Sequence, residues 1–200
     1  LTDMESDSNV RAILLTGSGD RAFSAGADIK EAARLASNSD TPAPDSPNID
    51  PNWHIASCTK PTIGAINGLA YGGAAVIASA LDIRVGCERT SFRFLAASYG
   101  RINSTWSLPM QVGWPLAKEL LFTARVIDAE EALKIGLLNR LVDSSEIMDE
   151  ANKIANQIAA NDPRMVQGMK EIMISNTGES WERMFKNEME AMSGTLKPTP

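Results

Sequence analysis

Two segments of small residues could supply backbone N–H groups to a negatively charged ligand. They are residues 24–28 (SAGAD) and residues 67–73 (NGLAYGG), and each lies between a predicted strand and a predicted helix. Small side chains leave the N–H groups at a helix N-terminus accessible, and the helix dipole favours negative charge there. One donor from each segment, converging on one oxygen, would form an oxyanion hole. Tight turns without a ligand have the same composition, so the spacing alone leaves both interpretations open.

The elements that must position these segments follow from hydrophobic patterning and from capping signals such as Asp128 and Gly136. Strands alternate with helices early in the chain and helices dominate late, which indicates an α/β core followed by a helical C-terminal region. Residues 37–52 are rich in Pro, Asp, Asn and Ser, so we expect a surface excursion with no regular helix. The predicted strands are 10–16, 62–66, 83–86 and 138–142, and the predicted helices are 28–36, 74–81, 114–122, 128–135, 145–160, 163–175 and 180–192.

The composition narrows the partners that the chain can have. Its net charge is −6 over 200 residues, which argues against binding to duplex nucleic acid. No run approaches 18 uncharged apolar residues, so we expect no membrane span. The single histidine, His54, excludes a multi-histidine metal site within one chain, and we expect it to be structural. Cys58 and Cys87 are expected to be reduced thiols of a cytoplasmic protein. The chain starts at Leu1 in what reads as a helix end, so we expect a preceding segment to be missing.

Several segments resemble the crotonase (enoyl-CoA hydratase/isomerase) family. Residues 22–31 (AFSAGADIKE) and 60–73 (KPTIGAINGLAYGG) are similar to its two signatures. Residues 82–85 (DIRV), 126–132 (VIDAEEA) and 135–142 (IGLLNRLV) match further family segments, in the family's order, within about residues 10–175. The resemblance implies repeated ββα units (the ClpP/crotonase fold), an acyl-CoA thioester as substrate, and coenzyme A entering with that substrate, with no other cofactor and no metal.

The resemblance also assigns roles to positions. The N–H groups of Ala27 and Gly73 would form the oxyanion hole. The acyl-CoA channel would be lined by Ala25, Gly26, Asp28, Ile29, Lys30, Gly72, Val76 and Ala96. Residues 1–142 would form the acyl-CoA-binding core, and residues 143–200 a helical region, truncated at its end, that mediates assembly into a homotrimer or a dimer of trimers. A role in the fatty acid metabolism of the cytoplasm would follow.

The chain departs from the family pattern at the two hydratase glutamates. Val76 and Ala96 occupy their positions, and neither side chain can transfer a proton. The polar candidates in the altered segment that follows are Tyr99, Asn103, Ser104 and Ser107, although Asn103 or Ser104 could instead cap a helix. Other acids are expected on the surface: Asp40, Asp45, Asp50, Glu88 and Glu119.

Three functions stay open at this point. The first is an acyl-CoA enzyme with a non-standard acid/base set, catalysing isomerisation, hydrolysis or decarboxylation. The second is an orthodox enoyl-CoA hydratase whose acids come from unexpected positions. The third is a non-catalytic acyl-CoA-binding subunit. The absence of acids at Val76 and Ala96 favours the first and the third.

Overall fold

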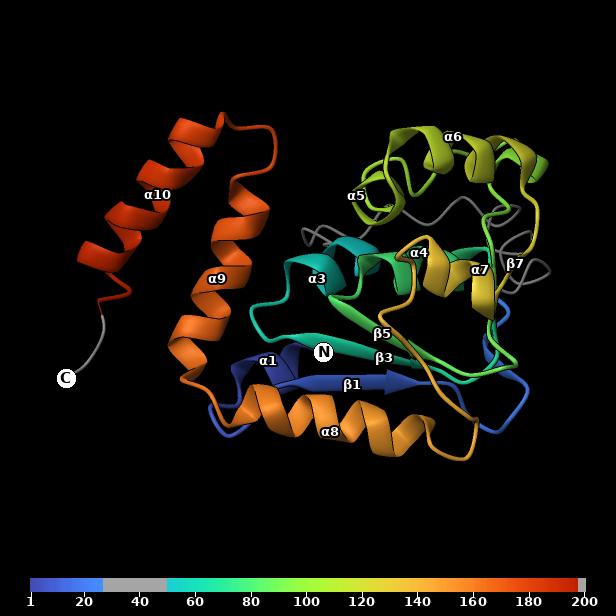
Figure 1. Ribbon diagram of the computed structural model, residues 1–200, viewed down its shortest axis with the longest axis horizontal. Coiled ribbons are helices and arrows are strands. Elements are labelled where there is room, and N and C mark those ends of the chain that lie inside the picture. The colour runs from blue at the N-terminus through green and yellow to red at the C-terminus, as the bar shows by residue number, and fades with distance from the viewer. Residues whose placement is uncertain (27–49, 198–200) are drawn as a thin grey trace, which may run out of the picture.

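The computed structural model describes residues 1–26 and 50–197, which form two four-stranded sheets surrounded by helices (Figure 1). The expected helix over 28–36 and most of the expected excursion over 37–52 lie outside the described residues. The first sheet has the order β1-β3-β5-β8 and is entirely parallel. The second has the order β2-β4-β6-β7, in which only β7 is antiparallel. The strands are β1 (Ile13–Thr16), β2 (Ala22–Ser24), β3 (Thr62–Ile66), β4 (Leu69–Tyr71), β5 (Ile83–Gly86), β6 (Ser91–Arg93), β7 (Ile127–Asp128) and β8 (Arg140–Leu141).

The two sheets are built from successive ββα units. In each unit the first strand joins one sheet and the second strand joins the other, as β3 and β4 do before helix α4 (Gly73–Ala80). Strands β5 and β6 repeat the pattern and lead into helices on the same side of the molecule. The predicted α/β class and the repeated ββα units are therefore confirmed. The helices after β6 are η1 (Ala97–Tyr99), α5 (Leu108–Val112), α6 (Trp114–Thr123) and α7 (Ala129–Lys134).

Sequence patterning located the first sheet better than the second. Strands β3 and β5 have the predicted bounds. Apolar and small residues dominate both strands, although β5 contains Arg84. The segment 67–73, expected to be one loop, instead contains β4. The side chain of Asn67 fixes the turn before β4, since it accepts from Gly17 N at 3.1 Å and donates to Gly19 O at 2.8 Å. A three-residue strand among small residues is too short to show a period-two pattern.

The first sheet is covered on both faces. All five residues of β3 are buried, as expected for a central parallel strand. Helix α8 (Ile147–Ala159) packs on one face through Ile147 and Ala151, which join the cluster around Ile63 and Val85. Helix α4 lies on the opposite side of the sheet (Figure 1).

A buried arginine ties α4, α5 and β5 together. Arg84 is 1% exposed, and its guanidinium donates to the carbonyl oxygens of Leu137 (2.6 Å) and Leu81. It also donates to Gln111 Oε1 at 2.7 Å, while Gln111 Nε2 donates to Ser79 O at 3.2 Å. Burial lowers the pKa of Arg84 to about 10. The position of α5 relative to α4 thus depends on this network of hydrogen bonds around Arg84 and Gln111.

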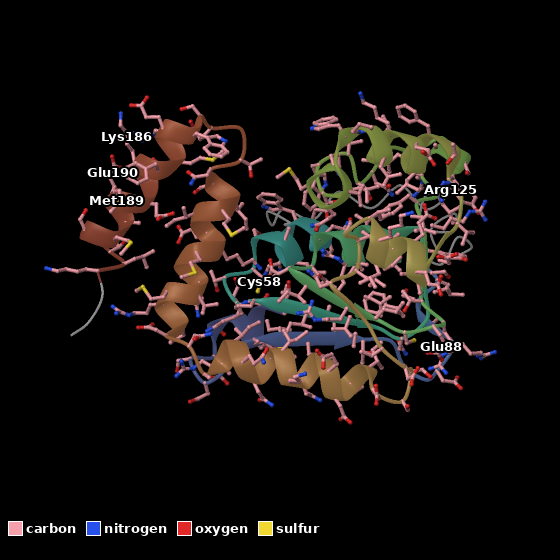
Figure 2. The ribbon with its side chains drawn as sticks, in the orientation of Figure 1. Cys58, Glu88, Arg125, Lys186, Met189 and Glu190 are labelled. Carbon is pink, nitrogen blue, oxygen red and sulfur yellow. The ribbon has the colours of Figure 1, made fainter. Side chains whose placement is uncertain are left out.

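The chain ends in two helices that reach away from the sheets, α9 (Pro163–Ser175) and α10 (Trp181–Ser193) (Figure 1). Lys170 anchors α9 to the core through Asp82, with 2.6 Å between Nζ and Oδ2. Helix α10 has no buried residue, and Figure 2 shows Lys186 and Met189 on it, far from the sheets. No helix in the described part of the chain has the length and apolarity that a membrane crossing needs.

The opposite end of the described chain is anchored by polar contacts as well. Helix α1 (Thr2–Ser6) meets α3 (Pro51–Ser57) through Glu5, whose Oε2 lies 3.0 Å from His54 Nε2. Cys58, at the end of α3, is free and buried, and burial raises the pKa of its thiol (Figure 2). Cys87 is also free and buried, as predicted. The expected surface loop was wrong at its end, because Pro51 and Asn52 begin α3.

Candidate functional site

The two small-residue segments meet at the N-terminus of α4. Gly26, at φ +91°, lies so close to the other segment that a Cβ on it would be 3.0 Å from Gly73 N and 2.7 Å from Tyr71 O. Gly72, at φ +57°, turns the chain from β4 into α4, and its N–H donates to Arg93 O at 2.9 Å. The prediction that these two segments lie next to each other in space is therefore confirmed for Gly26 and Gly73.

The N–H of Gly73 lies at the free N-terminal end of α4. Gly73 is the first residue of α4, so its N–H has no acceptor within the helix. Gly73 is exposed, although the next three residues of the helix are buried. Of the first segment, Ala25 is exposed and Gly26 donates to Ser24 Oγ at 3.2 Å. Ala27, Asp28, Ile29 and Lys30 lie outside the described residues.

A cavity of about 360 Å³ adjoins the same helix. It lies between α3, α4 and the connection from η1 to α5, and its size is at the lower end of the range for small-molecule sites. Val76 provides its wall on α4. The described residues that line it are Asp50, Asn52, Trp53, Val76, Ile102, Asn103, Ser104, Thr105 and Trp106.

Asn103 and Ser104, two of the candidates from the sequence, both line this cavity. Asn103 Oδ1 and Ser104 Oγ are buried, and within the described residues neither has a hydrogen-bond partner. Ser104 has φ +56°, a region that residues with a Cβ rarely adopt. The alternative that Asn103 or Ser104 caps a helix is wrong, because α5 begins at Leu108 with Ser107 before it and no side chain caps it.

Val76 and Ala96, the two positions to which the family resemblance assigned the hydratase glutamates, differ in their surroundings. Val76 is 4% exposed and lines the cavity. Ala96 is partly buried where η1 begins, and it is not among the lining residues. Tyr99 is 58% exposed on η1 and does not line the cavity either. The structure thus brings Val76, Asn103 and Ser104 together, and leaves Ala96 and Tyr99 outside that group.

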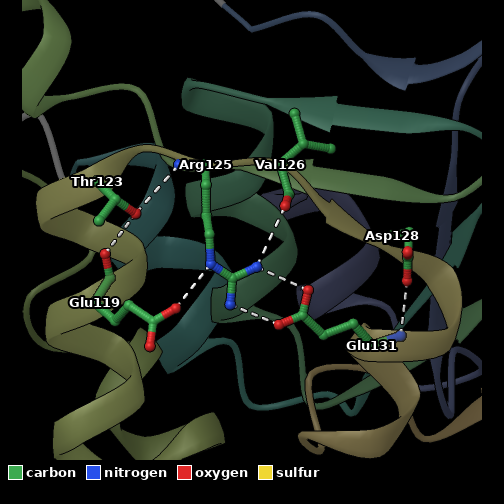
Figure 3. A network of polar contacts seen from close by, with 6 residues as sticks. All are labelled: Glu119, Thr123, Arg125, Val126, Asp128 and Glu131. Atoms are coloured by element: carbon green, nitrogen blue, oxygen red, sulfur yellow. Dashed lines mark hydrogen bonds and ion pairs between the residues drawn. The ribbon is translucent and has the colours of Figure 1, made fainter.

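Two of the acids considered from the sequence, Glu119 and Glu88, have partners away from the cavity, and Asp40 and Asp45 lie outside the described residues. Glu119 pairs with Arg125 at 2.8 Å, and the same guanidinium binds Glu131 at 2.6 and 2.8 Å (Figure 3). Glu88, exposed at another edge of the molecule (Figure 2), accepts from Ser144 N at 2.9 Å. His54 is paired with Glu5 and does not line the cavity.

Asp50 is an acid that sequence reasoning placed on the surface and that the structure places at the cavity. Its Oδ1 caps α3 by accepting from Asn52 N at 2.8 Å and Trp53 N at 3.4 Å. The hydrogen bond from the Asn52 backbone lowers the pKa of Asp50, so its carboxylate is ionised at neutral pH. The pair Asp50-Pro51 is a helix-start signal that could have revealed α3 and its cap.

Two tryptophans complete the wall of the cavity and were missed as well. Trp53 on α3 and Trp106 before α5 meet edge to face, with ring centroids 5.8 Å apart and an interplanar angle of 71°. They are 53 positions apart in the chain, so only the tertiary structure brings them together. Among the described residues, no group of three or more His, Cys, Asp or Glu could hold a metal ion.

Comparisons with known proteins agree with this architecture. The family model described as enoyl-CoA hydratase/isomerase matches residues 1–198. The short-chain-enoyl-CoA hydratase of Clostridium acetobutylicum is 38% identical over 175 residues, covering 84% of this chain and 66% of that protein. The carnitinyl-CoA dehydratase of Proteus mirabilis is 34% identical over 198 residues, covering 97% and 74%. The crystal structure of enoyl-CoA hydratase from Bacillus anthracis superposes with a TM-score of 0.85 at 28% identity, covering 99% of this chain and 78% of that chain. The chain thus spans about two thirds to three quarters of the length of these proteins.

Proposed function

This chain belongs to the enoyl-CoA hydratase/isomerase family, and on that premise we propose that it binds an acyl-CoA thioester and stabilises its enolate with two backbone N–H groups. The donors are Gly73 N–H and Ala27 N–H. The observation that carries the proposal is the contact between Gly26 and Gly73, because it brings the residue before Ala27 against the exposed start of α4. Negative charge develops on the thioester oxygen when the α-carbon loses a proton or the β-carbon is attacked. Losing one such donor typically costs about 3 kcal/mol of transition-state stabilisation.

The thioester would lie along the segment that leads to this oxygen site. Ala25, Gly26 and the following residues Asp28, Ile29 and Lys30 would line the channel on one side. Gly72, Val76 and Ala96 would line it on the other. The cavity behind Val76 would receive the acyl group, since its volume of about 360 Å³ suits a small group.

The acid/base set is non-standard in this proposal. Val76 cannot transfer a proton, and an amide or an aliphatic hydroxyl, such as Asn103 or Ser104, is a poor proton donor or acceptor near neutral pH. Asn103 Oδ1 and Ser104 Oγ are also buried, so neither atom is exposed to the cavity. Isomerisation, hydrolysis or decarboxylation then fits the site better than hydration by two glutamates. Tyr99 would participate only if the exposed η1 turned toward the acyl group.

Asp50 gives the alternative of an orthodox hydratase a specific form, because its carboxylate lines the cavity. An ionised carboxylate could act as the base from an unexpected position. In the non-catalytic alternative the chain would bind thioesters and turn none over. Hydration by the wild type that Asp50→Asn abolishes would support Asp50 as the base, whereas thioester binding with no hydration by the wild type would support the non-catalytic alternative.

The test is the hydration of crotonyl-CoA, followed by loss of the absorbance of the conjugated thioester. We expect the wild-type chain to bind crotonyl-CoA and to hydrate it far more slowly than a two-glutamate enzyme, since positioned acids and bases contribute about 10²–10⁴-fold each. The double variant Val76→Glu and Ala96→Glu should hydrate it faster than the wild type, and each single variant should gain less. Wild-type turnover near 10³ s⁻¹, the top of the usual range, would refute the non-standard set.

We also propose that residues 143–200 contribute to assembly into a homotrimer or a dimer of trimers. The support is the apolar surface of the two last helices, on which Met173 is 75%, Trp181 90% and Phe185 63% exposed. Such side chains are more exposed than is usual for a monomer. Light scattering at micromolar concentration should give a multiple of three chain masses, and a monomer or a dimer would contradict the proposal. We place the protein in the cytoplasm, in fatty acid metabolism, which suits its two free cysteines.

A further inference from the structure

A buried network of hydrogen bonds joins α4 to α5 behind the cavity. Ser79 on α4 is 1% exposed and Ser107, directly before α5, is 3% exposed, and their Oγ atoms lie 2.8 Å apart. Gln111 on α5 donates from Nε2 to Ser79 O at 3.2 Å and accepts at Oε1 from Arg84 at 2.7 Å. None of these four residues lines the cavity, so the network supports its walls from outside.

Ser107 gives its hydroxyl to this network instead of to its own helix. It is the N-cap residue of α5, where a serine hydroxyl ordinarily accepts from an N–H of the first turn, and here that bond is not made. The hydroxyl of Ser79 is donated to Val76 O at 2.9 Å, so the hydrogen between the two serines comes from Ser107. Ser107 therefore connects two helices where a serine would usually cap one.

The network connects two walls of the cavity. Val76 forms one wall, stands one turn before Ser79 on α4, and provides the carbonyl that accepts from Ser79. The opposite wall comes from residues 102–106, directly before Ser107, and this segment contains no helix or strand. Because the segment has no regular structure of its own, its distance from α4 depends on the bonds made by Ser107 and Gln111.

The other side chains of this second wall do not replace that connection. Asn103 Oδ1 and Ser104 Oγ are buried without a partner among the described residues, so they add no bond to α4. The ring of Trp106 meets Trp53, which lies on α3. In the part of the chain that the structure describes, the network behind the cavity thus supplies the hydrogen bonds that tie this wall to α4.

We propose that Ser107 and Gln111 are positioning residues that limit the length of the acyl chain in the cavity. The inference rests on the proposed function, because it concerns the acyl group that the cavity takes. Ligand pockets span about 300–1,000 Å³, so a cavity of about 360 Å³ takes only a short chain while its walls stay in place. Each methylene that enters should tighten binding about fourfold, and methylenes beyond the limit should add nothing.

The experiment measures the affinities of acetyl-CoA, butyryl-CoA, octanoyl-CoA and dodecanoyl-CoA by titration calorimetry. For the wild type we expect affinity to rise from acetyl-CoA to butyryl-CoA and to level off before dodecanoyl-CoA. Gln111→Leu and Ser107→Ala should each release the wall, and should raise the ratio of dodecanoyl-CoA affinity to butyryl-CoA affinity at least about tenfold, the effect of two further buried methylenes.

Two further variants separate positioning from support of the fold. Gln111→Glu keeps an acceptor for Arg84 and loses the donor to Ser79 O, so it should change the ratio as Gln111→Leu does. Ser107→Thr keeps the hydroxyl and should retain the ratio of the wild type. A general loss of stability would lower all four affinities together and leave their ratio unchanged.

Gln157→Leu and Ser98→Ala are the matched controls, because both residues are exposed and lie outside the cavity, on α8 and η1. Neither should change any of the four affinities. An unchanged ratio in both Gln111→Glu and Ser107→Ala, or a parallel loss of all affinities in both, overturns the assignment. So does a wild-type affinity that keeps rising to dodecanoyl-CoA. If the wild type binds none of the four thioesters, the proposed function itself fails.

Discussion

Gly26 offers a direct test of the contact on which the oxyanion site depends. In the variant Gly26→Ala, the new Cβ would lie 2.7 Å from Tyr71 O and 3.0 Å from Gly73 N. The residue would also keep a φ of +91°, which costs a residue with a Cβ about 1–2 kcal/mol. The crowding adds a further ~1–3 kcal/mol, the usual cost of inserting a methyl into a packed site. We expect Gly26→Ala to lower the free energy of unfolding by about 2–5 kcal/mol in urea titration.

Gly19→Ala separates the backbone cost from the crowding. Gly19 has a similar φ of +79°, and nothing lies within 4 Å of its would-be Cβ. This control should lose only about 1–2 kcal/mol of stability and bind butyryl-CoA as the wild type does.

The effect on ligand binding follows from the position of the new methyl beside Gly73 N. Gly26→Ala should weaken butyryl-CoA binding about tenfold, the loss of one hydrogen bond, measured by calorimetry under conditions where the variant is folded. For any thioester that the chain converts, kcat should fall by about 10²-fold or more, because a donor in the transition state is blocked. Equal binding and equal stability of Gly26→Ala and Gly19→Ala would show that Gly73 N–H is not part of the site.

Three predictions concern the framework around the site. Arg84→Met should cost about 3–5 kcal/mol in urea unfolding, because it leaves carbonyl oxygens of a buried network without a donor, and an unchanged midpoint would contradict the role of that network. Arg125 lowers the pKa of Glu131 below its ordinary 4.5, so the pair stabilises the fold above that value and the contribution disappears as pH falls through the lowered pKa. Glu131→Gln should therefore destabilise by up to about 1 kcal/mol at pH 7 and by less as the pH is lowered below 4.5, and a difference independent of pH would refute this account. Lys170→Met should speed hydrogen exchange in α9 while amides of α4 stay protected, since the contact between Lys170 and Asp82 holds α9 to the core; equal protection of α9 in both proteins would argue against that anchor.

The parts of the fold that sequence reasoning found are those with strong local signals. Residues 62–66 and 83–86 are short segments of mostly apolar and small residues, and they were assigned with the bounds that the structure has. Asp128 was identified as a helix cap, and its side chain accepts from Glu131 N at 2.8 Å. Strand β4 was predicted as part of a loop, because its hydrogen bonds to β2 and β6 are made with residues far away in the chain. Short strands of this kind are specified by tertiary pairing more than by local preference.

The residues of the candidate site show the same contrast, because local sequence patterns indicated some of them and only the tertiary packing reveals the others. Gly73 was found because two glycines open a helix, a local pattern. Asn103 and Ser104 were chosen for their polarity, and the alternative that one of them caps a helix is wrong, because α5 begins only at Leu108. No local rule for serine predicts the left-handed conformation of Ser104. Trp53 lies on α3 and Asp50 caps it, and both line the cavity. This helix was missed because it begins at the end of a Pro-rich segment. The proximity of Trp53 and Asp50 to Val76 depends on how α3 packs against α4, and a single sequence carries no direct signal for that packing.

The order of the strands has a consequence for how the chain is made. In both sheets each new strand pairs with the strand that the preceding unit contributed, so the sheets can grow in the same direction as synthesis on the ribosome. At every intermediate stage the last strand, β3 or later β5, presents an unpaired parallel edge rich in apolar residues. Such edges pair readily with other chains. The nascent protein is therefore most prone to aggregate between the completion of β5 and the arrival of β8, an interval of more than fifty residues.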